Sequence, residues 1–275
     1  MGLMALKLAV TIAIVIGLAL IAERASPRLA GLVAGYPLGT AIVLFFLGLE
    51  QGPVFAATSA VYAIAGLSAT FGFLYAYYLA TRGQEKVEAD GKTAAGGKHA
   101  GLIRGPLAAM AAFFSLSALI NQIGMTRTLA TLLTVSTAWL AVLAFRAIAD
   151  GVLIAPVRLS LAALAVRAVL AAVTVLAITG LALALGPDWS GLLAGFPITL
   201  FPLLLIIHFQ YGRQPVHAII RNFPYGAGAI IIHALTVSFT YPALGIAAGT
   251  AAAFAAASLY LAAALFLSAN RGRRS

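Results

Sequence analysis

The stretch Gly31-Leu-Val-Ala-Gly-Tyr-Pro37 occurs a second time as Gly191-Leu-Leu-Ala-Gly-Phe-Pro197. The two copies lie 160 residues apart (191 − 31), and the same offset pairs further residues without a gap. These outer pairs are Lys7 with Arg167, Pro27 with Pro187, Leu44 with Leu204, Gly52 with Gly212, and Gly66 with Gly226. Both copies lie inside long apolar runs, so the sequence indicates a duplicated membrane unit. Matched apolar segments interrupted by Gly and Pro are typical of the midplane site of a transporter.

The composition indicates a protein that lies mostly in lipid. Of its 275 residues, 63% are hydrophobic and 9% are charged, and the mean hydropathy is +1.05. A soluble domain has about 25% charged residues. Backbone polar groups in lipid must be paired internally, which leaves helices or closed barrels. The apolar runs are about 20 residues long, a length that favours helices. We therefore expect an all-α, polytopic membrane protein.

The apolar runs predict nine transmembrane helices. They lie near residues 3–22, 29–49, 54–81, 104–123, 127–146, 165–186, 190–210, 215–239 and 242–268. The polar stretch 82–104 is the one long loop, and residues 147–164 form a second connection. We divide the chain into a first transmembrane repeat (1–123), a linking helix with its connection (124–164), and a second repeat with a basic tail (165–275).

The positive charges predict how these helices are oriented. If the N-terminus lies outside, only Lys7 and Arg127 of the 17 Lys and Arg residues lie at outer ends. Lys and Arg normally concentrate on the cytoplasmic side. We therefore expect a multi-pass protein of the plasma (inner) membrane with an outer N-terminus and a cytoplasmic C-terminus. Because the Lys and Arg residues lie mainly between apolar runs or at the C-terminus, we interpret the net charge of +10 as a signal for orientation in the membrane. It is therefore not evidence for nucleic-acid binding, which we do not expect.

The odd number of helices between the two copies predicts inverted repeats, with helices 1–4 facing the opposite way to helices 6–9. Two similar halves that face opposite ways can exchange conformations, which gives inward-open and outward-open states of similar energy. A static bundle that inherited a duplication is the alternative, because fold symmetry does not establish function.

The repeated motif is the first candidate site. Its glycines are four residues apart and share one helix face, where they allow another backbone to approach closely. Pro37 and Pro197 break their helices at about the bilayer midplane. Tyr36 and Phe196 are candidates for stacking or gating, and Thr40 and Thr199 for hydroxyl contacts. The alternative is glycine packing with a proline kink. The assigned residues are Gly31, Gly35, Tyr36, Pro37 and Thr40, and Gly191, Gly195, Phe196, Pro197 and Thr199.

Polar residues of the second copy form the other candidate group. They are His208, Arg213, His217, Arg221, Asn222 and His233. Ionisable residues in membrane segments are functional candidates, although Arg213 and Arg221 also suit anchoring among anionic headgroups. No acidic residue lies near the middle of a predicted span, and Glu50 is expected to be solvated at a span end. The basic residues and the two helix N-termini after the prolines favour an anionic or phosphate-bearing substrate.

Enzyme motifs are missing from the sequence: it has no P-loop, no Gly-x-Ser-x-Gly, no dinucleotide fingerprint and no metal-ligand spacing. The four histidines are scattered along the chain, and the chain has no cysteine, which excludes thiolate chemistry. We therefore expect no enzymatic activity, no catalytic residues, no cofactor and no metal. The expected partners are the lipid bilayer and the substrate, and a homo-oligomer is left open.

The run from Leu6 to Gly52 resembles the small GlpM-like bacterial membrane proteins. These have an apolar span, a short charged turn and a Gly/Ala-rich segment that ends in Pro, a pattern close to residues 31–40 here. Helices 6–8 look like a second copy of this unit, so the resemblance covers about two thirds of the chain. That family's link to exopolysaccharide (alginate) production implies export of a glycan precursor or its lipid carrier. This chain differs in being fused and in gaining helix 5.

The expected function is alternating-access transport of a small anionic solute, or of a lipid-linked phosphate or glycan precursor by a flippase. The alternative is a non-transporting membrane subunit that scaffolds an envelope or exopolysaccharide biosynthesis complex. A scaffold would keep the motif glycines packed and dry, whereas a transporter would expose them to water from each side in turn.

Overall fold

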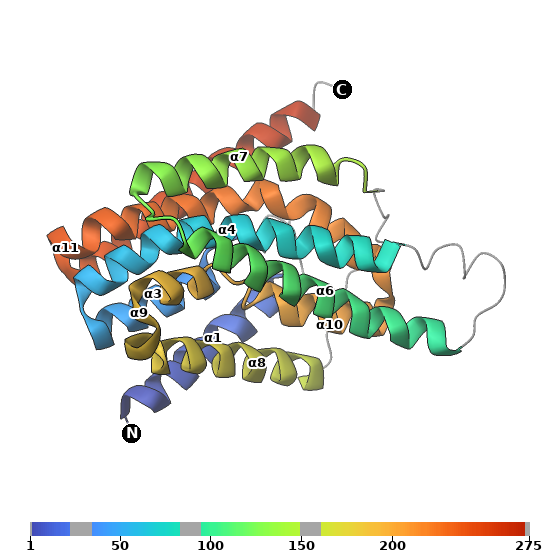
Figure 1. Cartoon of the computed structure of the whole chain (residues 1–275), viewed down its shortest axis with the longest axis horizontal. Coiled ribbons are helices and arrows are strands. Elements are labelled where there is room, and N and C mark those ends of the chain that lie inside the picture. The colour runs from blue at the N-terminus through green and yellow to red at the C-terminus, as the bar shows by residue number, and fades with distance from the viewer. Residues whose placement is uncertain (1, 23–34, 83–94, 149–160, 273–275) are drawn as a thin grey trace.

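The computed structural model describes residues 2–22, 35–82, 95–148 and 161–272. These residues form nine helices (Figure 1), which confirms the all-α class. The helices are α1 (Gly2–Ala22), α3 (Leu38–Gln51), α4 (Pro53–Arg82), α6 (Ala95–Asn121), α7 (Arg127–Phe145), α8 (Leu161–Gly180), α9 (Ala182–Ala194), α10 (Leu200–Tyr211) and α11 (Arg213–Gly272). Residue Gly31 of the first motif lies outside the described residues, as does most of the predicted loop 82–104.

Within the described residues, four helical segments are long and apolar enough to cross a membrane: Pro53–Arg82, Gly101–Asn121, Arg127–Phe145 and Arg213–Ala264. The outward surface of α7 is itself apolar, because Leu132, Val135, Trp139 and Leu140 are each more than half exposed. A large exposed apolar surface marks contact with lipid or with another protein. The helices are therefore compatible with a membrane-embedded protein.

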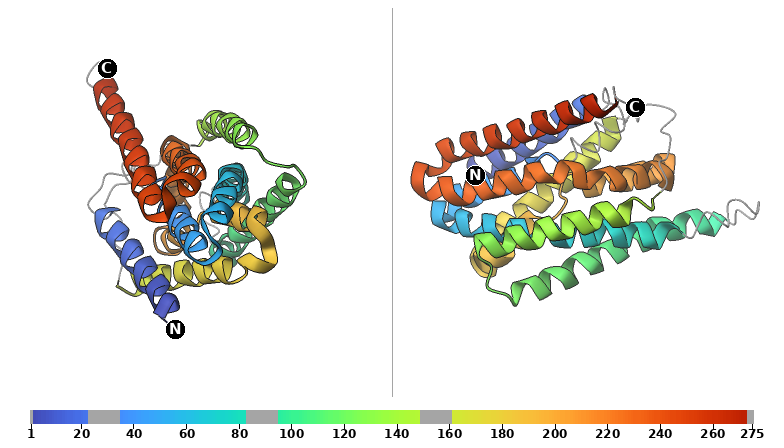
Figure 2. Two further views of the ribbon diagram at one scale, coloured as in Figure 1. Left: turned by 90° about the vertical axis from the view of Figure 1, so that its left-hand side faces the viewer. Right: turned by 90° about the horizontal axis from the view of Figure 1, so that it is seen from above.

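Helix α4 lies at the centre of the bundle (Figure 2) and packs against α3, α6, α7, α9 and α11. The most apolar part of α4 is 83% buried, compared with 22% for that of α7. A helix that is apolar on every side is suited to a position surrounded by other helices. In Figure 1, α1 starts near one end of the bundle and α11 finishes towards the other.

Several helix ends differ from the predicted ones. The helix expected at 104–123 starts at Ala95, inside a stretch rich in Gly and Lys that is typical of a loop. The helices expected at 165–186 and 190–210 are replaced by α8, α9 and α10. The two expected at 215–239 and 242–268 lie within α11, which consists of two helices joined at a kink at Gly245 (φ +77°), a few residues after the predicted boundary. Glycine adopts this backbone conformation at little cost, whereas other residues do not.

Candidate functional site at the two helix breaks

Both prolines of the repeated motif lie at a helix start. Pro37 is the N-cap residue of α3, and its carbonyl accepts a hydrogen bond from the amide of Ala41 at 2.7 Å. In the second copy, α9 ends at Ala194 and α10 starts at Leu200. The Pro197 carbonyl there accepts from the amide of Phe201 at 2.8 Å. The two prolines thus have the same local backbone pattern, 160 residues apart. We call the non-helical stretches 35–37 and 195–199 the two breaks; the residues before Gly35 lie outside the described part of the chain.

The helices that follow the breaks also end alike. Helix α3 ends at Gly52 (φ +93°), whose amide donates to the carbonyl of Gly48 at 3.0 Å. Helix α10 ends at Gly212 (φ +80°), whose amide donates to the carbonyl of His208 at 3.0 Å. Each helix therefore reverses into the long helix that follows it, α4 in one case and α11 in the other. The positive φ explains the matched glycines.

Each break packs against the long helix of the other copy through a pair of glycines. A Cβ added to Gly35 would lie 2.3 Å from the carbonyl carbon of Gly226 in α11. A Cβ added to Gly195 would lie 2.9 Å from the carbonyl carbon of Gly66 in α4. Gly35 and Gly195 are equivalent under the 160-residue offset, and so are Gly66 and Gly226. The two contacts are therefore matching contacts between the copies.

A third motif glycine, Gly191, makes an equally close contact with α4. A Cβ there would lie 2.2 Å from the carbonyl oxygen of Ser59 and 2.6 Å from the Cβ of Tyr62. The prediction that the motif glycines allow close backbone approach is therefore confirmed at Gly35, Gly191 and Gly195.

A cavity of about 20 Å³ lies where the two breaks meet, and this is room for about one water molecule. Its lining includes five pairs of residues that are equivalent under the offset. These pairs are Tyr36 with Phe196, Pro37 with Pro197, Gly39 with Thr199, Thr40 with Leu200, and Thr70 with Ile230. The structure thus brings the motif residues of both copies to one point.

Two threonines of the first copy bind the open end of α9. Thr40 donates its hydroxyl to the carbonyl of Ala194 at 2.9 Å, and Thr70 donates to the carbonyl of Gly195 at 2.7 Å. The last carbonyls of a helix lack partners within that helix, so these hydroxyls satisfy them. In the second copy, the backbone carbonyl of Thr199 accepts a hydrogen bond from Nε of Arg167 at 3.2 Å.

The motif aromatics both pack on other rings. Tyr36 stacks on Phe254 with ring centroids 6.2 Å apart, and its hydroxyl is 2.8 Å from Oγ of Ser258. Phe196 makes edge contacts with Phe73, Phe113 and Phe201. The second copy thus has a purely apolar aromatic cluster where the first has a hydrogen-bonding one.

Three of the predicted basic residues meet near the far end of α10. His208 is hydrogen-bonded through Nδ1 to the hydroxyl of Tyr77 at 2.8 Å, and His217 through Nε2 to the hydroxyl of Thr81 at 2.8 Å. The buried Arg213 lies within electrostatic range of both rings. We call His208, Arg213, His217, Tyr77 and Thr81 the basic cluster. Its two α4 residues were missed by the sequence analysis, because a hydroxyl in an apolar run gives no signal of its partner.

The other predicted polar residues lie apart from this cluster. Arg221 donates Nη1 to the carbonyl of Ile148 just beyond α7, and Asn222 donates to the carbonyl of Ala218 in its own helix at 2.8 Å. His233 is fully buried. Neither of its ring nitrogens has a hydrogen-bond partner among the described residues, and its ring makes an edge contact with Phe254 at 5.0 Å. His233 therefore lies beside the Tyr36 aromatic cluster.

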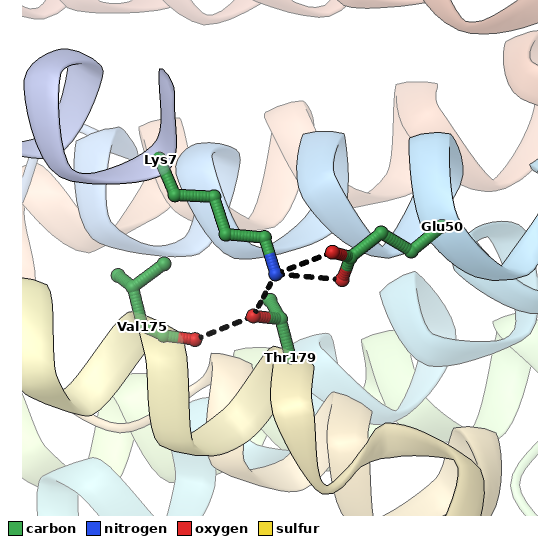
Figure 3. A network of polar contacts seen from close by, with 4 residues as sticks. All are labelled: Lys7, Glu50, Val175 and Thr179. Atoms are coloured by element: carbon green, nitrogen blue, oxygen red, sulfur yellow. Dashed lines mark hydrogen bonds and ion pairs between the residues drawn. The ribbon is translucent and has the colours of Figure 1, made fainter. Parts of the chain in front are cut away.

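An ion pair between Lys7 and Glu50 is the largest feature that sequence reasoning missed. Nζ of Lys7 lies 2.6 Å and 2.7 Å from the two carboxylate oxygens of Glu50 and donates to Oγ1 of Thr179 at 2.6 Å (Figure 3). Lys7 is 5% exposed, and the Glu50 side chain is 21% exposed. The expectation that Glu50 is simply solvated is therefore wrong. Its partner is Lys7, 43 residues away along the chain.

No protein-family model, no curated protein and no solved structure matches the chain. Among the described residues, no group of three His, Asp or Glu side chains is placed to hold a metal ion.

Proposed function

We propose that this protein is an alternating-access membrane transporter with two inverted repeats. The observation that carries the proposal is the cavity between the two breaks, lined by five pairs of equivalent residues. Such pairing is expected when two copies are related by an approximate two-fold axis through that point. Inverted repeats whose broken helices meet near the midplane are a recurring transporter architecture.

The glycine contacts support this proposal because they connect the copies at two equivalent places. Gly35 packs on Gly226, and Gly195 packs on Gly66. If the copies exchange conformations, one of these contacts opens to one side of the membrane while its counterpart stays closed. The cavity of about 20 Å³ then corresponds to a closed state, because a solute needs a larger opening.

The proposed substrate is an anion, either a small solute or a lipid-linked phosphate such as the carrier of a glycan precursor. Support comes from the basic cluster, in which Arg213 and two histidines lie with two hydroxyls close to the end of α10. Arginine binds phosphate and carboxylate groups through fixed, charge-assisted hydrogen bonds. With the N-terminus outside, this cluster lies at the cytoplasmic end of its helices.

Thiol labelling tests the proposal, because the natural chain contains no cysteine. Thr40→Cys and Leu200→Cys place one thiol at equivalent points of the cavity lining, where both residues are nearly fully buried. A membrane-impermeant maleimide is applied from either face in turn. We expect each thiol to react from both faces, with the balance between faces shifting when a transported anion is added. Val43→Cys is the matched control, since Val43 is fully buried in α3 and does not line the cavity.

The same experiment separates transport from scaffolding. In a scaffold, the thiols at positions 40 and 200 stay as unreactive as the one at position 43, from both faces and with every anion added. That result in a folded protein would overturn the transporter proposal and favour the membrane subunit of an envelope or exopolysaccharide biosynthesis complex.

A further inference from the structure

Arg167 is a buried cation whose counterpart in the first copy has a carboxylate partner, whereas Arg167 has none among the described residues. Lys7 and Arg167 are equivalent under the 160-residue offset, and so are Glu50 and Gln210. Both basic residues are 5% exposed. Lys7 is neutralised by Glu50, whereas the position equivalent to Glu50 carries a neutral amide. A buried charge is costly unless it is paired.

The contacts of Arg167 leave part of its guanidinium unused. Nε donates to the carbonyl of Thr199 at 3.2 Å, but Nη1 is buried with no hydrogen-bond partner among the described residues. Thr199 immediately precedes α10, a helix of 12 residues, so the guanidinium lies at that helix's N-terminus. A helix N-terminus favours anions. A phosphate or carboxylate placed there would neutralise Arg167 and accept from Nη1.

One face of α8 leads from Arg167 into an apolar cavity of about 390 Å³, a size within the usual range for ligand pockets. Leu170 lies one turn after Arg167, and Thr174 and Ile178 continue the same face of α8. Helices α6, α9 and α10 supply the other walls, and Thr174 has the only hydroxyl among the lining residues described. Leu170 and Leu181, which line the cavity, are 41% and 55% exposed, so the cavity opens at the outer surface of the bundle.

We infer that Arg167 and the N-terminus of α10 bind the phosphate of an anionic lipid whose hydrocarbon chain occupies this cavity. The guanidinium, which has no counter-ion among the described residues, and the apolar cavity that begins one turn further along α8 match the two ends of such a molecule. Phe196 and Ile198 line both this cavity and the one between the breaks, so the bound lipid lies directly beside the proposed transport pathway. That the lipid is the transported substrate rests on the proposed function, whereas its binding does not.

Equilibrium binding of hexadecyl phosphate to the purified full chain in phosphatidylcholine nanodiscs tests this inference. Arg167→Gln is expected to weaken binding by about tenfold or more, because glutamine supplies neither the positive charge nor the charge-assisted hydrogen bond to the phosphate. Arg167→Lys should retain part of the affinity. Arg127→Gln is the matched control: it removes the same charge from an arginine whose guanidinium is bound to Ser238, and it should leave binding unchanged.

Ala177→Trp tests the cavity without altering the charge. Ala177 lines the cavity and is exposed at its opening, so the larger side chain fills space without disturbing the core. It is expected to weaken binding of hexadecyl phosphate as strongly as Arg167→Gln does. Val169→Trp, at an exposed α8 position outside the cavity, should have no effect. The two α8 variants Ala177→Trp and Val169→Trp keep the inference testable if Arg167→Gln fails to fold.

Two results would overturn the inference. One is binding of hexadecyl phosphate that survives both Arg167→Gln and Ala177→Trp. The other is inorganic phosphate that binds as tightly as hexadecyl phosphate, which would indicate a simple anion site. Binding that depends on Arg167, combined with thiols at positions 40 and 200 that never react, would contradict transport but leave the lipid site in place.

Discussion

Lys7 and Glu50 form the ion pair that joins α1 to α3, and Thr179 of α8 completes it. Removing one member of a buried pair leaves an uncompensated charge, which costs roughly 3–5 kcal/mol. We therefore expect Lys7→Met to lower the free energy of unfolding by about 3 kcal/mol, at the low end because Glu50 is partly exposed. Thermal unfolding in detergent measures this loss.

The double variant Lys7→Met with Glu50→Gln is the control for that prediction. It removes both charges, so it should recover most of the stability lost in the single variant. If the double variant is less stable than Lys7→Met alone, the pair is not the source of the loss.

His233 and Phe73 are equivalent under the offset, and each lies in an aromatic cluster beside a motif aromatic. His233 differs because both of its nitrogens are buried without partners among the described residues. A buried polar group without a hydrogen bond costs about 1–3 kcal/mol. His233→Phe should therefore raise the melting temperature, which differential scanning fluorimetry measures. An unchanged or lower value would show that the ring is satisfied in the folded protein.

The helix breaks belong to the element scale, and the glycine contacts predict their sensitivity. Gly35→Ala should be more damaging than Gly195→Ala, because the added Cβ would meet the backbone of α11 at 2.3 Å but the backbone of α4 at 2.9 Å. Gly17→Ala is the control: a Cβ on Gly17 meets nothing within 4 Å, and Ala is favoured over Gly within a helix by about 1 kcal/mol.

Yield of folded protein and melting temperature rank these three glycine variants. The expected order of stability is Gly17→Ala first, then Gly195→Ala, and Gly35→Ala last. Equal stability of Gly35→Ala and Gly17→Ala would mean that the contact with Gly226 is not close in the folded protein.

Most helices could be predicted from the sequence, because long apolar runs and the repeated Gly-Pro motif influence the backbone close to where they occur. The breaks at Pro37 and Pro197 follow from the lost amide donor and the ring clash of proline. The start of α6 at Ala95 did not follow, since glycine and lysine there indicate a loop and local propensity is only a weak guide. The boundary between the last two predicted helices was placed a few residues before the kink at Gly245, because the apolar run continues across the kink and does not mark its position.

At the scale of the whole molecule, the offset identified which residues are equivalent but not which ones touch. The contact between Lys7 and Thr179 spans 172 residues, and the contact of Arg167 with Thr199 depends on how α8 crosses the second break. Such partners are fixed by helix packing, which leaves no short-range pattern in the sequence. Three of the five residues of the basic cluster were predicted for the same reason: its α10 and α11 members are ionisable residues, whereas its α4 members are hydroxyls within an apolar run.

Joining the two copies covalently tests whether they must move relative to one another. A Cβ on Gly39, in the first turn of α3, would lie 3.3 Å from the Cβ of Ile198, which a shift of a few tenths of an ångström brings within the usual 3.5–4.5 Å of a disulfide. Gly39→Cys with Ile198→Cys should therefore form a disulfide under mild oxidation, detected by mass spectrometry. In proteoliposomes, a transporter should stop moving a fluorescent lipid phosphate between leaflets when oxidised and resume when reduced. Each single cysteine variant controls for oxidation alone, and movement that continues with the disulfide complete would contradict alternating access through this point.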